Sequence, residues 1–195
     1  MLLQDSATPR LFGLIVSTVN EFHRAYFEDA RAHCCQLIGL IFKSIERTEA
    51  KYEAMGPQDE ASLPAEAKSV LMNILEERRF DKSAVVRVEV VRALSVFCQM
   101  SDLMRYDAKF EPNSYIISAL RDVSLSVRKE AARCTRLISK VEIAAFVSAI
   151  VEEQDSDFRY IAYNRVINDL HVRSLTVEQR TLLLKIAFDE SGGRF

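Results

Sequence analysis

A group of basic residues near the middle of the chain is spaced for binding phosphate. Between residues 121 and 140 the sequence holds six basic residues against two acidic ones, in a chain whose formal net charge is −2. Four of them follow one another at spacings of four, three and four residues, which places them along one face of a helix: Lys129, Arg133, Arg136 and Lys140. Because each neutralised phosphate adds affinity, this stripe is a candidate for contact with the backbone of double-stranded DNA. The alternative is a solvated helix face.

The remaining sequence holds no pattern typical of a catalyst. It contains no GxSxG turn, no phosphate-binding loop, no HExxH and no GxGxxG motif. Asp155 and Asp157 lie close together, but an isolated D-x-D pair predicts the N-cap region of a helix rather than a metal site. We therefore predict that the protein is not an enzyme and uses no metal, no cofactor and no small-molecule substrate.

The four cysteines also lack the spacing of metal ligands. They form no CxxC pair, and the histidines of the chain do not cluster with them, which argues against a zinc site. Most of them fall at apolar positions of helical patterns, so we predict small buried side chains in a reducing compartment. The cysteines are Cys34, Cys35, Cys98 and Cys134.

Four segments of the chain share one pattern centred on an arginine. In each, apolar or small residues stand one position before the arginine and three and seven positions after it, which lines one face of a helix. Three segments also carry an acid six residues before the arginine, whereas the first has Ala25 there. We predict that these acids and arginines form a structural ladder across neighbouring repeats. The first arginine is Arg31, and the ladder residues are Asp81, Arg87, Asp122, Arg128, Glu153 and Arg159.

Amphipathic segments that precede the four arginine-centred segments complete a series of helix pairs. Glycine and proline are scarce, 5 and 4 residues, which favours long helices with short connections. Thr176 and Gln179 form a capping box that begins one more helix, from about Val177 to Asp189. The preceding helices are expected over residues 9–26, 65–79, 113–121 and 142–153.

Helix pairs of this kind cannot bury their apolar faces alone, so they stack into an array. The interval from Arg87 to Arg128 falls within the period of about 40–47 residues typical of HEAT repeats. We therefore predict an all-α fold, a HEAT-repeat α-solenoid in which antiparallel helix pairs form a right-handed superhelix. The array is expected to span 1–195 as about four helix pairs plus one unpaired helix, with an exposed insertion at 46–62. Because the last helix lacks a partner, we expect a fragment of a longer solenoid.

No run of the sequence is apolar for long enough to cross a membrane, and the first residues lack the pattern of a signal peptide. We therefore expect the protein in the cytosol or the nucleus, with no membrane partner.

Several of these segments resemble the HEAT-repeat G subunit of condensin. Ala30–Ile41 is similar to the family's first-repeat motif, and Val85–Ser95 is similar to the next. The most specific similarity lies in Phe158–Ile167 and His171–Arg180, which match an R-x-x-A-Y helix followed by H-[VM]-R-[AS]-L-[ST]-x-x-Q-R. The similarity runs from about Ala30 to Ala187, which is most of the chain, although the chain is much shorter than members of that family and lacks their later repeats.

The resemblance implies a non-catalytic subunit that serves mitotic chromosome condensation. Such a subunit binds the kleisin subunit of condensin and grips the DNA backbone without sequence specificity, so Lys129, Arg133 and Arg136 would meet phosphate. ATP hydrolysis would belong to the SMC subunits, which are reached through kleisin. The implied location is the nucleus and the chromosome, and also the cytoplasm.

Two other functions remain open from the sequence. One is a helical-repeat adaptor of the transport or phosphatase-scaffold type, which has only protein partners and would show no salt-dependent binding to duplex DNA. The other is a HEAT-like DNA-repair glycosylase, which requires an acid and aromatic side chains that converge in a cleft. Base excision on alkylated DNA would support this second alternative.

Overall fold

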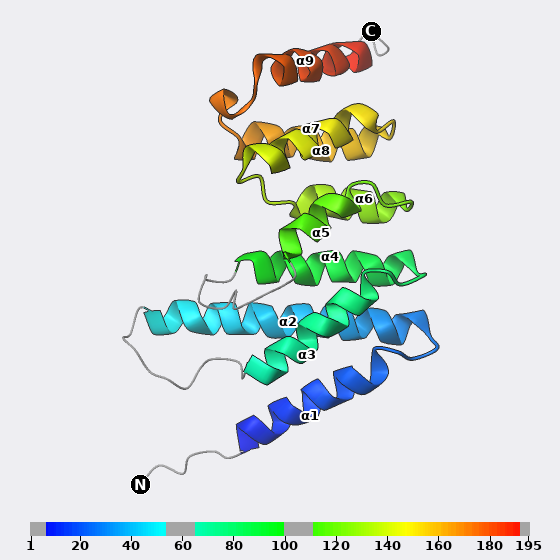
Figure 1. Ribbon diagram of the computed structural model, residues 1–195, viewed down its shortest axis with the longest axis vertical. Helices are drawn as coiled ribbons and strands as arrows, with labels where there is room; N and C mark the ends of the chain where they lie inside the picture. Colours follow the sequence, from blue (N-terminus) through cyan, green and yellow to red (C-terminus); the bar gives the residue numbers. More distant parts are fainter. Residues whose placement is uncertain (1–6, 54–64, 100–110, 192–195) are drawn as a thin grey trace. The chain divides into compact units, whose positions relative to one another are not determined.

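The computed structural model describes residues 7–53, 65–99 and 111–191, and within these ranges the regular elements are nine α-helices and one 3-10 turn, with no strand (Figure 1). The predicted all-α fold is therefore confirmed for the described residues. The chain divides into two compact units, unit 1 at residues 1–112 and unit 2 at residues 113–195. The prediction of one continuous array across both units stays a prediction.

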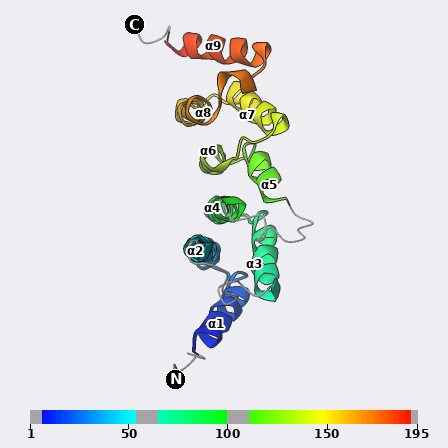
Figure 2. The ribbon, with the colours of Figure 1, turned by 90° about the vertical axis from the view of Figure 1, so that its left-hand side faces the viewer.

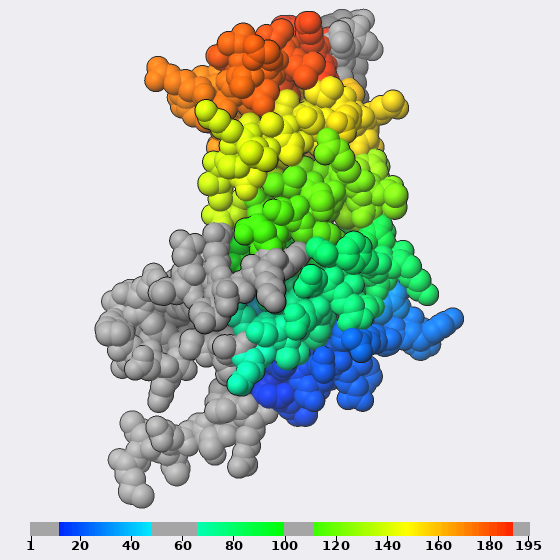
Figure 3. Space-filling view, viewed as in Figure 1, coloured from blue at the N-terminus to red at the C-terminus, as the bar shows by residue number. Residues whose placement is uncertain are grey.

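Unit 1 contains α1 (Ala7–Phe22), α2 (Glu28–Glu53), α3 (Ala65–Arg78) and α4 (Ala84–Gln99). Within it, α1 packs against α3 and α2 packs against α4. Figure 2 shows the four helices as two layers, with α1 and α3 in one and α2 and α4 in the other. In the space-filling view the atoms of α1 and α3, blue and blue-green, lie against each other on one face of this unit (Figure 3).

Unit 2 contains α5 (Pro112–Ala119), α6 (Leu125–Cys134), α7 (Lys140–Glu152), α8 (Ser156–Asp169), the 3-10 turn Val172–Ser174 and α9 (Val177–Ser191). Here α6 packs against α8, and α7 packs against α8 and α9. The Tyr163 hydroxyl of α8 donates a hydrogen bond of 2.8 Å to the Leu183 carbonyl of α9, which ties the last helix to this unit.

Two of the predicted helix caps are present in the structure. Asp155 accepts a hydrogen bond of 2.8 Å from the Phe158 amide, as expected for the N-cap of α8. Thr176 and Gln179 form the reciprocal capping box at the start of α9, with hydrogen bonds of 2.9 and 3.2 Å. By contrast, α2 continues through residues 46–53 of the predicted insertion, and residues 54–62 lie outside the described part of the chain.

The packing of α2 on α4 fixes the register of unit 1. A Cβ atom added at Gly39 would stand 3.3 Å from the Cα of Ala93, so the two backbones approach each other at this point. One turn further along, the rings of Phe42 and Phe97 are fully buried, with their centroids 5.2 Å apart. The small residue and the ring pair therefore seat the two helices at one relative height.

Three of the four cysteines are buried. These are Cys34, Cys35 and Cys98, whereas Cys134 is partly buried, and none of the four is in a disulfide bond. Burial raises the pKa of Cys35 to about 12, so this thiol stays protonated and unreactive near neutral pH. The prediction of small buried side chains is confirmed for three of the four cysteines.

Replacing Gly39 by valine is expected to destabilise unit 1. The new side chain would collide with the Ala93 backbone, and overpacking of this kind destabilises by about 1–3 kcal/mol. The gain in helix propensity over glycine is smaller, about 0.5 kcal/mol. The free energy of unfolding from urea titrations followed by circular dichroism checks this expectation.

Gly13→Ala is the matched control, because nothing lies within 4 Å of a Cβ atom at Gly13 of α1. This change is expected to leave stability unchanged or to raise it by up to about 1 kcal/mol. Equal effects of the two substitutions would show that the close approach at Gly39 does not limit the packing.

Candidate functional site

The arginine of each repeat pattern holds the connection that precedes its own helix. In all four, the guanidinium donates a hydrogen bond to the backbone carbonyl of the residue six positions earlier, at distances between 2.6 and 3.0 Å. These connections join paired helices, and we call them corners. The four contacts run from Arg31 to Ala25, from Arg87 to Asp81, from Arg128 to Asp122 and from Arg159 to Glu153.

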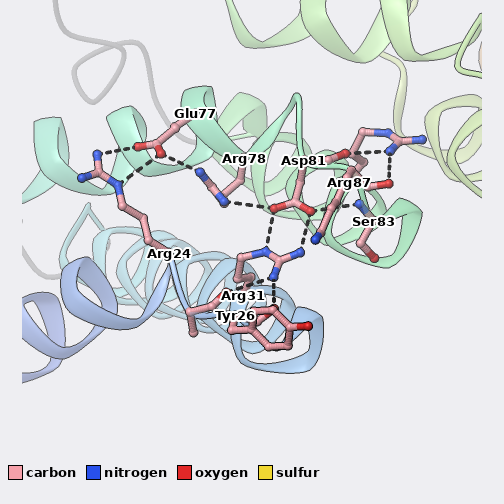
Figure 4. Close-up of polar contacts among 10 residues, drawn as sticks. Arg24, Tyr26, Arg31, Glu77, Arg78, Asp81, Ser83 and Arg87 are labelled. Atoms are coloured by element: carbon pink, nitrogen blue, oxygen red, sulfur yellow. Dashed lines mark hydrogen bonds and ion pairs between the residues drawn. The ribbon is translucent and has the colours of Figure 1, made fainter.

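In unit 1 the same arginine also reaches the acid of the next corner. Arg31 Nε and Nη2 donate to the two carboxylate oxygens of Asp81 at 2.8 and 2.9 Å (Figure 4). Both side chains are buried, with 5% and 3% of their surface exposed. Arg78 adds a contact of 3.0 Å to Asp81, whose other oxygen accepts from the Ser83 amide at 2.9 Å. Every hydrogen-bonding direction of this carboxylate is thus directed at a donor.

The charge state of Asp81 follows from these donors. Burial by itself would raise the pKa of Asp81, but hydrogen bonds from Arg31 and the Ser83 amide and the charges of Arg31 and Arg78 together lower it below its usual value of 3.8. A carboxyl with a lowered pKa stabilises the folded state at pH values above its unfolded pKa. That stabilisation is lost as the pH falls through the lowered pKa.

A second, exposed ion pair joins the same two corners. Arg24 donates to the two carboxylate oxygens of Glu77 at 3.2 and 2.9 Å, and Arg78 contacts Glu77 at 2.5 Å (Figure 4). Arg24 stands seven residues before Arg31. Unit 1 therefore has two arginine-to-acid contacts between its corners, one buried and one exposed.

Unit 2 repeats this arrangement between its own corners. Arg128 donates to Glu153 at 2.6 Å, and Arg121, seven residues before Arg128, donates to Glu152 at 3.1 and 2.9 Å. Glu153 also accepts from the Asp155 amide at 3.1 Å, as Asp81 does from Ser83. Burial would raise the pKa of Glu153, but the bond from Arg128 and the backbone donors lower it overall.

The structure therefore brings together Arg31 with Asp81 and Arg128 with Glu153, and each pair lies within one unit. Sequence reasoning missed the outer contacts of Arg24 and Arg121. The sequence feature that could have predicted these contacts is a second arginine seven residues before the arginine of the repeat pattern, which occurs in the first and third segments. In the other two segments that position holds Phe80 and Glu152.

The predicted basic stripe does not lie on one helix, so that prediction is wrong. Helix α6 ends at Cys134, Arg136 lies in the irregular segment that follows, and Lys140 is the first residue of α7. Helix α7 begins at a capping box between Ser139 and Glu142, which the stripe prediction did not consider.

The early end of α6 has an identifiable cause in α8. Arg165 donates to the Ala132 carbonyl at 3.1 Å and to the Thr135 carbonyl at 2.8 Å, and it also contacts the Arg133 carbonyl. The guanidinium is oriented by Asp169 on the same helix. It thereby satisfies carbonyl groups that a helix end leaves without partners.

The basic residues of the predicted stripe differ in the ion pairs and hydrogen bonds that they form. Lys129 lies between Asp155 and Asp157 at 2.9 and 3.0 Å, and Arg133 pairs with Glu130 at 3.1 Å. Lys140 is exposed. The Arg136 amide donates to the side chain of Asn113, a bond that anchors the segment before α7.

Within the described ranges, no group of three or more His, Cys, Asp or Glu residues is arranged to hold a metal ion. None of the helices described is long and apolar enough to cross a bilayer.

In a comparison with protein families, the chain matches the family described as the C30G12.6 N-terminal domain over residues 5–194. The chain belongs to this family. The match takes in the helices of both units, so the corners and their arginines all lie within the family domain. No curated protein matches the chain.

His23 is buried beside the exposed ion pair of unit 1. It follows α1 directly and is 2% exposed, and its Nδ1 atom has no hydrogen-bond partner among the described residues. Burial lowers the pKa of His23, the charges of Arg78 and Arg24 lower it further, and Glu77 partly opposes them. The folded state therefore favours the neutral ring.

Removing Asp81 is expected to destabilise unit 1 strongly. Asp81→Ala would leave Arg31 charged and buried without its partner, which destabilises by roughly 3 kcal/mol or more. Arg31→Met combined with Asp81→Leu should recover much of that loss, because no unpaired charge remains. Urea unfolding of the wild type, Asp81→Ala and the double variant measures the loss and its recovery. Glu77→Gln, at the exposed contact, is the control and should change stability far less.

The folded protein is expected to lose stability as the pH falls below about 6.5, the ordinary pKa of histidine. In that range the unfolded chain binds a proton at His23 that the folded chain resists, so stability declines until the lowered pKa of His23 is passed. His23→Gln removes this group and should flatten that part of the profile. Thermal unfolding between pH 7.5 and 5 tests this, and an unchanged profile in the variant would rule His23 out as the source.

Proposed function

We propose that this protein is a HEAT-type helical-repeat scaffold that works by binding other macromolecules. The supporting observation is the corner arrangement that recurs in both units, in which the arginine of one helix pair bonds its own corner and the acid of the next. A buried contact between successive helix pairs is what an array of stacked repeats requires, because each repeat contacts chiefly its neighbours.

Within that class, we propose a condensin subunit of the G type, which binds the kleisin subunit and the DNA backbone in chromosome condensation. The support is the sequence resemblance over Phe158–Ile167 and His171–Arg180, which form most of α8, the 3-10 turn and the start of α9. Several residues of this stretch have local structural roles. The His171 ring accepts a hydrogen bond from the Arg173 amide, and Thr176 caps α9. Some of the residues that carry the resemblance therefore stabilise the connection between α8 and α9.

Contact with DNA would have to come from basic residues on separate elements. Arg136 precedes the capping box of α7, Lys140 is the first residue of that helix, and Arg133 is half exposed at the end of α6. Cations grouped at a helix junction can follow a phosphate backbone without reading bases. Kleisin would connect the scaffold to the SMC ATPase subunits, and the protein would act in the nucleus.

The ion pairs of Lys129 and Arg133 with carboxylates favour a second candidate, an adaptor that binds protein partners only. A cation already paired with carboxylates offers less to a phosphate, because binding must first break the existing pair. This candidate retains the scaffold proposal and drops the DNA contact.

The two candidates differ in binding to duplex DNA. For the condensin-type subunit we expect the full chain to retain a kleisin fragment in a pull-down and to bind labelled duplex DNA with an affinity that falls as salt rises. Arg133→Glu with Arg136→Glu should weaken DNA binding roughly tenfold or more, since two phosphate contacts become repulsive. Fluorescence anisotropy at several salt concentrations measures this loss.

Lys185→Glu on α9 is the control variant, because it makes a similar charge reversal on a different helix. Equal DNA affinity in the wild type, the double variant and the control would show that Arg133 and Arg136 do not contact DNA. Absence of salt-dependent DNA binding by the wild type would leave the protein-only adaptor. Failure to retain kleisin, with no binding to DNA, would refute the condensin-type assignment.

A further inference from the structure

The corner between α1 and α2 presents two aromatic rings to solvent. Tyr26 and Phe27 are 84% and 72% exposed, and their rings meet edge to face with centroids 5.5 Å apart. The backbone beneath them is fixed, because Arg31 donates to the Tyr26 carbonyl at 2.8 Å while it holds Asp81 (Figure 4). Exposed aromatic side chains on a rigid support are typical of binding hot spots.

The uncompensated charge around these rings is negative. The nearby arginines are committed within unit 1, Arg24 to Glu77 and Arg31 to Asp81. The carboxylates of Glu28 and Asp29, in the first turn of α2, are exposed and have no ion-pair or hydrogen-bond partner among the described residues. They suit the positive end of the helix dipole, which offsets only part of their charge.

The corner between α3 and α4 contains a cation–π contact of the kind that an exposed ring can make. Phe80 is 76% exposed, and the Arg79 guanidinium lies over its ring, 4.4 Å from the centroid. No cation of the described residues lies over the ring of Tyr26 or Phe27. Their ring faces, which carry partial negative charge, remain available to a cation from outside.

We propose that the corner formed by Tyr26, Phe27, Glu28 and Asp29 binds arginine or lysine side chains from a basic segment of a partner protein. The rings provide cation–π contacts, and the two carboxylates provide charge complementarity. The same carboxylates would repel the phosphates of a nucleic acid or of an acidic lipid surface, so the partner is a protein segment. This surface is independent of the DNA contact proposed above, since it uses none of the residues assigned to that contact.

The proposal is tested by titrating the full chain into a fluorescein-labelled peptide of alternating arginine and glycine, with anisotropy as the readout. Replacing both rings, Tyr26→Ser with Phe27→Ser, is expected to weaken binding roughly tenfold, as expected for the loss of two exposed cation–π contacts. Replacing both acids, Glu28→Gln with Asp29→Asn, should weaken binding and reduce its dependence on salt.

Phe80→Ser is the matched control, because this ring is equally exposed and already has its cation in Arg79. It should leave the dissociation constant unchanged, and thermal unfolding should show each variant folded. Unchanged affinity after loss of Tyr26 and Phe27, or an equal loss in Phe80→Ser, would overturn the proposal. Equally tight binding of a glutamate–glycine peptide would also overturn it. So would a wild-type dimer in sedimentation velocity that the double ring variant abolishes, because the rings would then pack on a second copy.

Discussion

The fold of each unit depends on arginine-to-acid contacts at the corners, buried in unit 1 and partly buried in unit 2. A guanidinium carries five donors in a fixed plane, which allows Arg31 to bond two carbonyls of its own corner and both oxygens of Asp81 in the next. A lysine could not satisfy that set, because its ammonium group offers a single point of charge. The Arg31–Asp81 contact therefore holds the α1–α2 corner and the α3–α4 corner together and fixes the position of one helix pair relative to the next.

This polar contact works together with apolar packing on the adjoining helices. In unit 1 the Gly39–Ala93 approach and the Phe42–Phe97 pair seat α2 on α4, while the ion pairs fix the ends of those helices. The bidentate ion pair is directional, so it and the close apolar approach favour the same seating of α2 on α4. His23 lies at the margin of this arrangement, where a further positive charge would meet arginines already in place.

The sequence allowed the helices and the arginine pattern to be predicted because both depend on local rules. Apolar spacing marked the helix faces, and Thr176 and Asp155 marked helix starts. The stripe through Lys129, Arg133, Arg136 and Lys140 failed because helical spacing was extended past Cys134, where a distant side chain, Arg165, ends the helix. Contacts of this kind depend on which helices become neighbours, and spacing along a single helix contains no information about that. The exposed rings at Tyr26 and Phe27 were missed for a related reason, since apolar residues at a helix connection resemble core residues until burial is known.

The position of the corner contacts also explains how repeats of unequal length can share the same arginine-to-acid pairing. Both ion pairs of unit 1 lie at the ends where α1 passes to α2 and α3 passes to α4, whereas α2 and α3 are connected at their other ends. Among the described residues, no ladder contact lies at the ends where α2 is followed by α3. Closing a longer loop there costs little, because the entropy grows only with the logarithm of its length. The interval from Arg31 to Arg87 can thus exceed that from Arg128 to Arg159 while the arginine-to-acid pairing at the corners is kept.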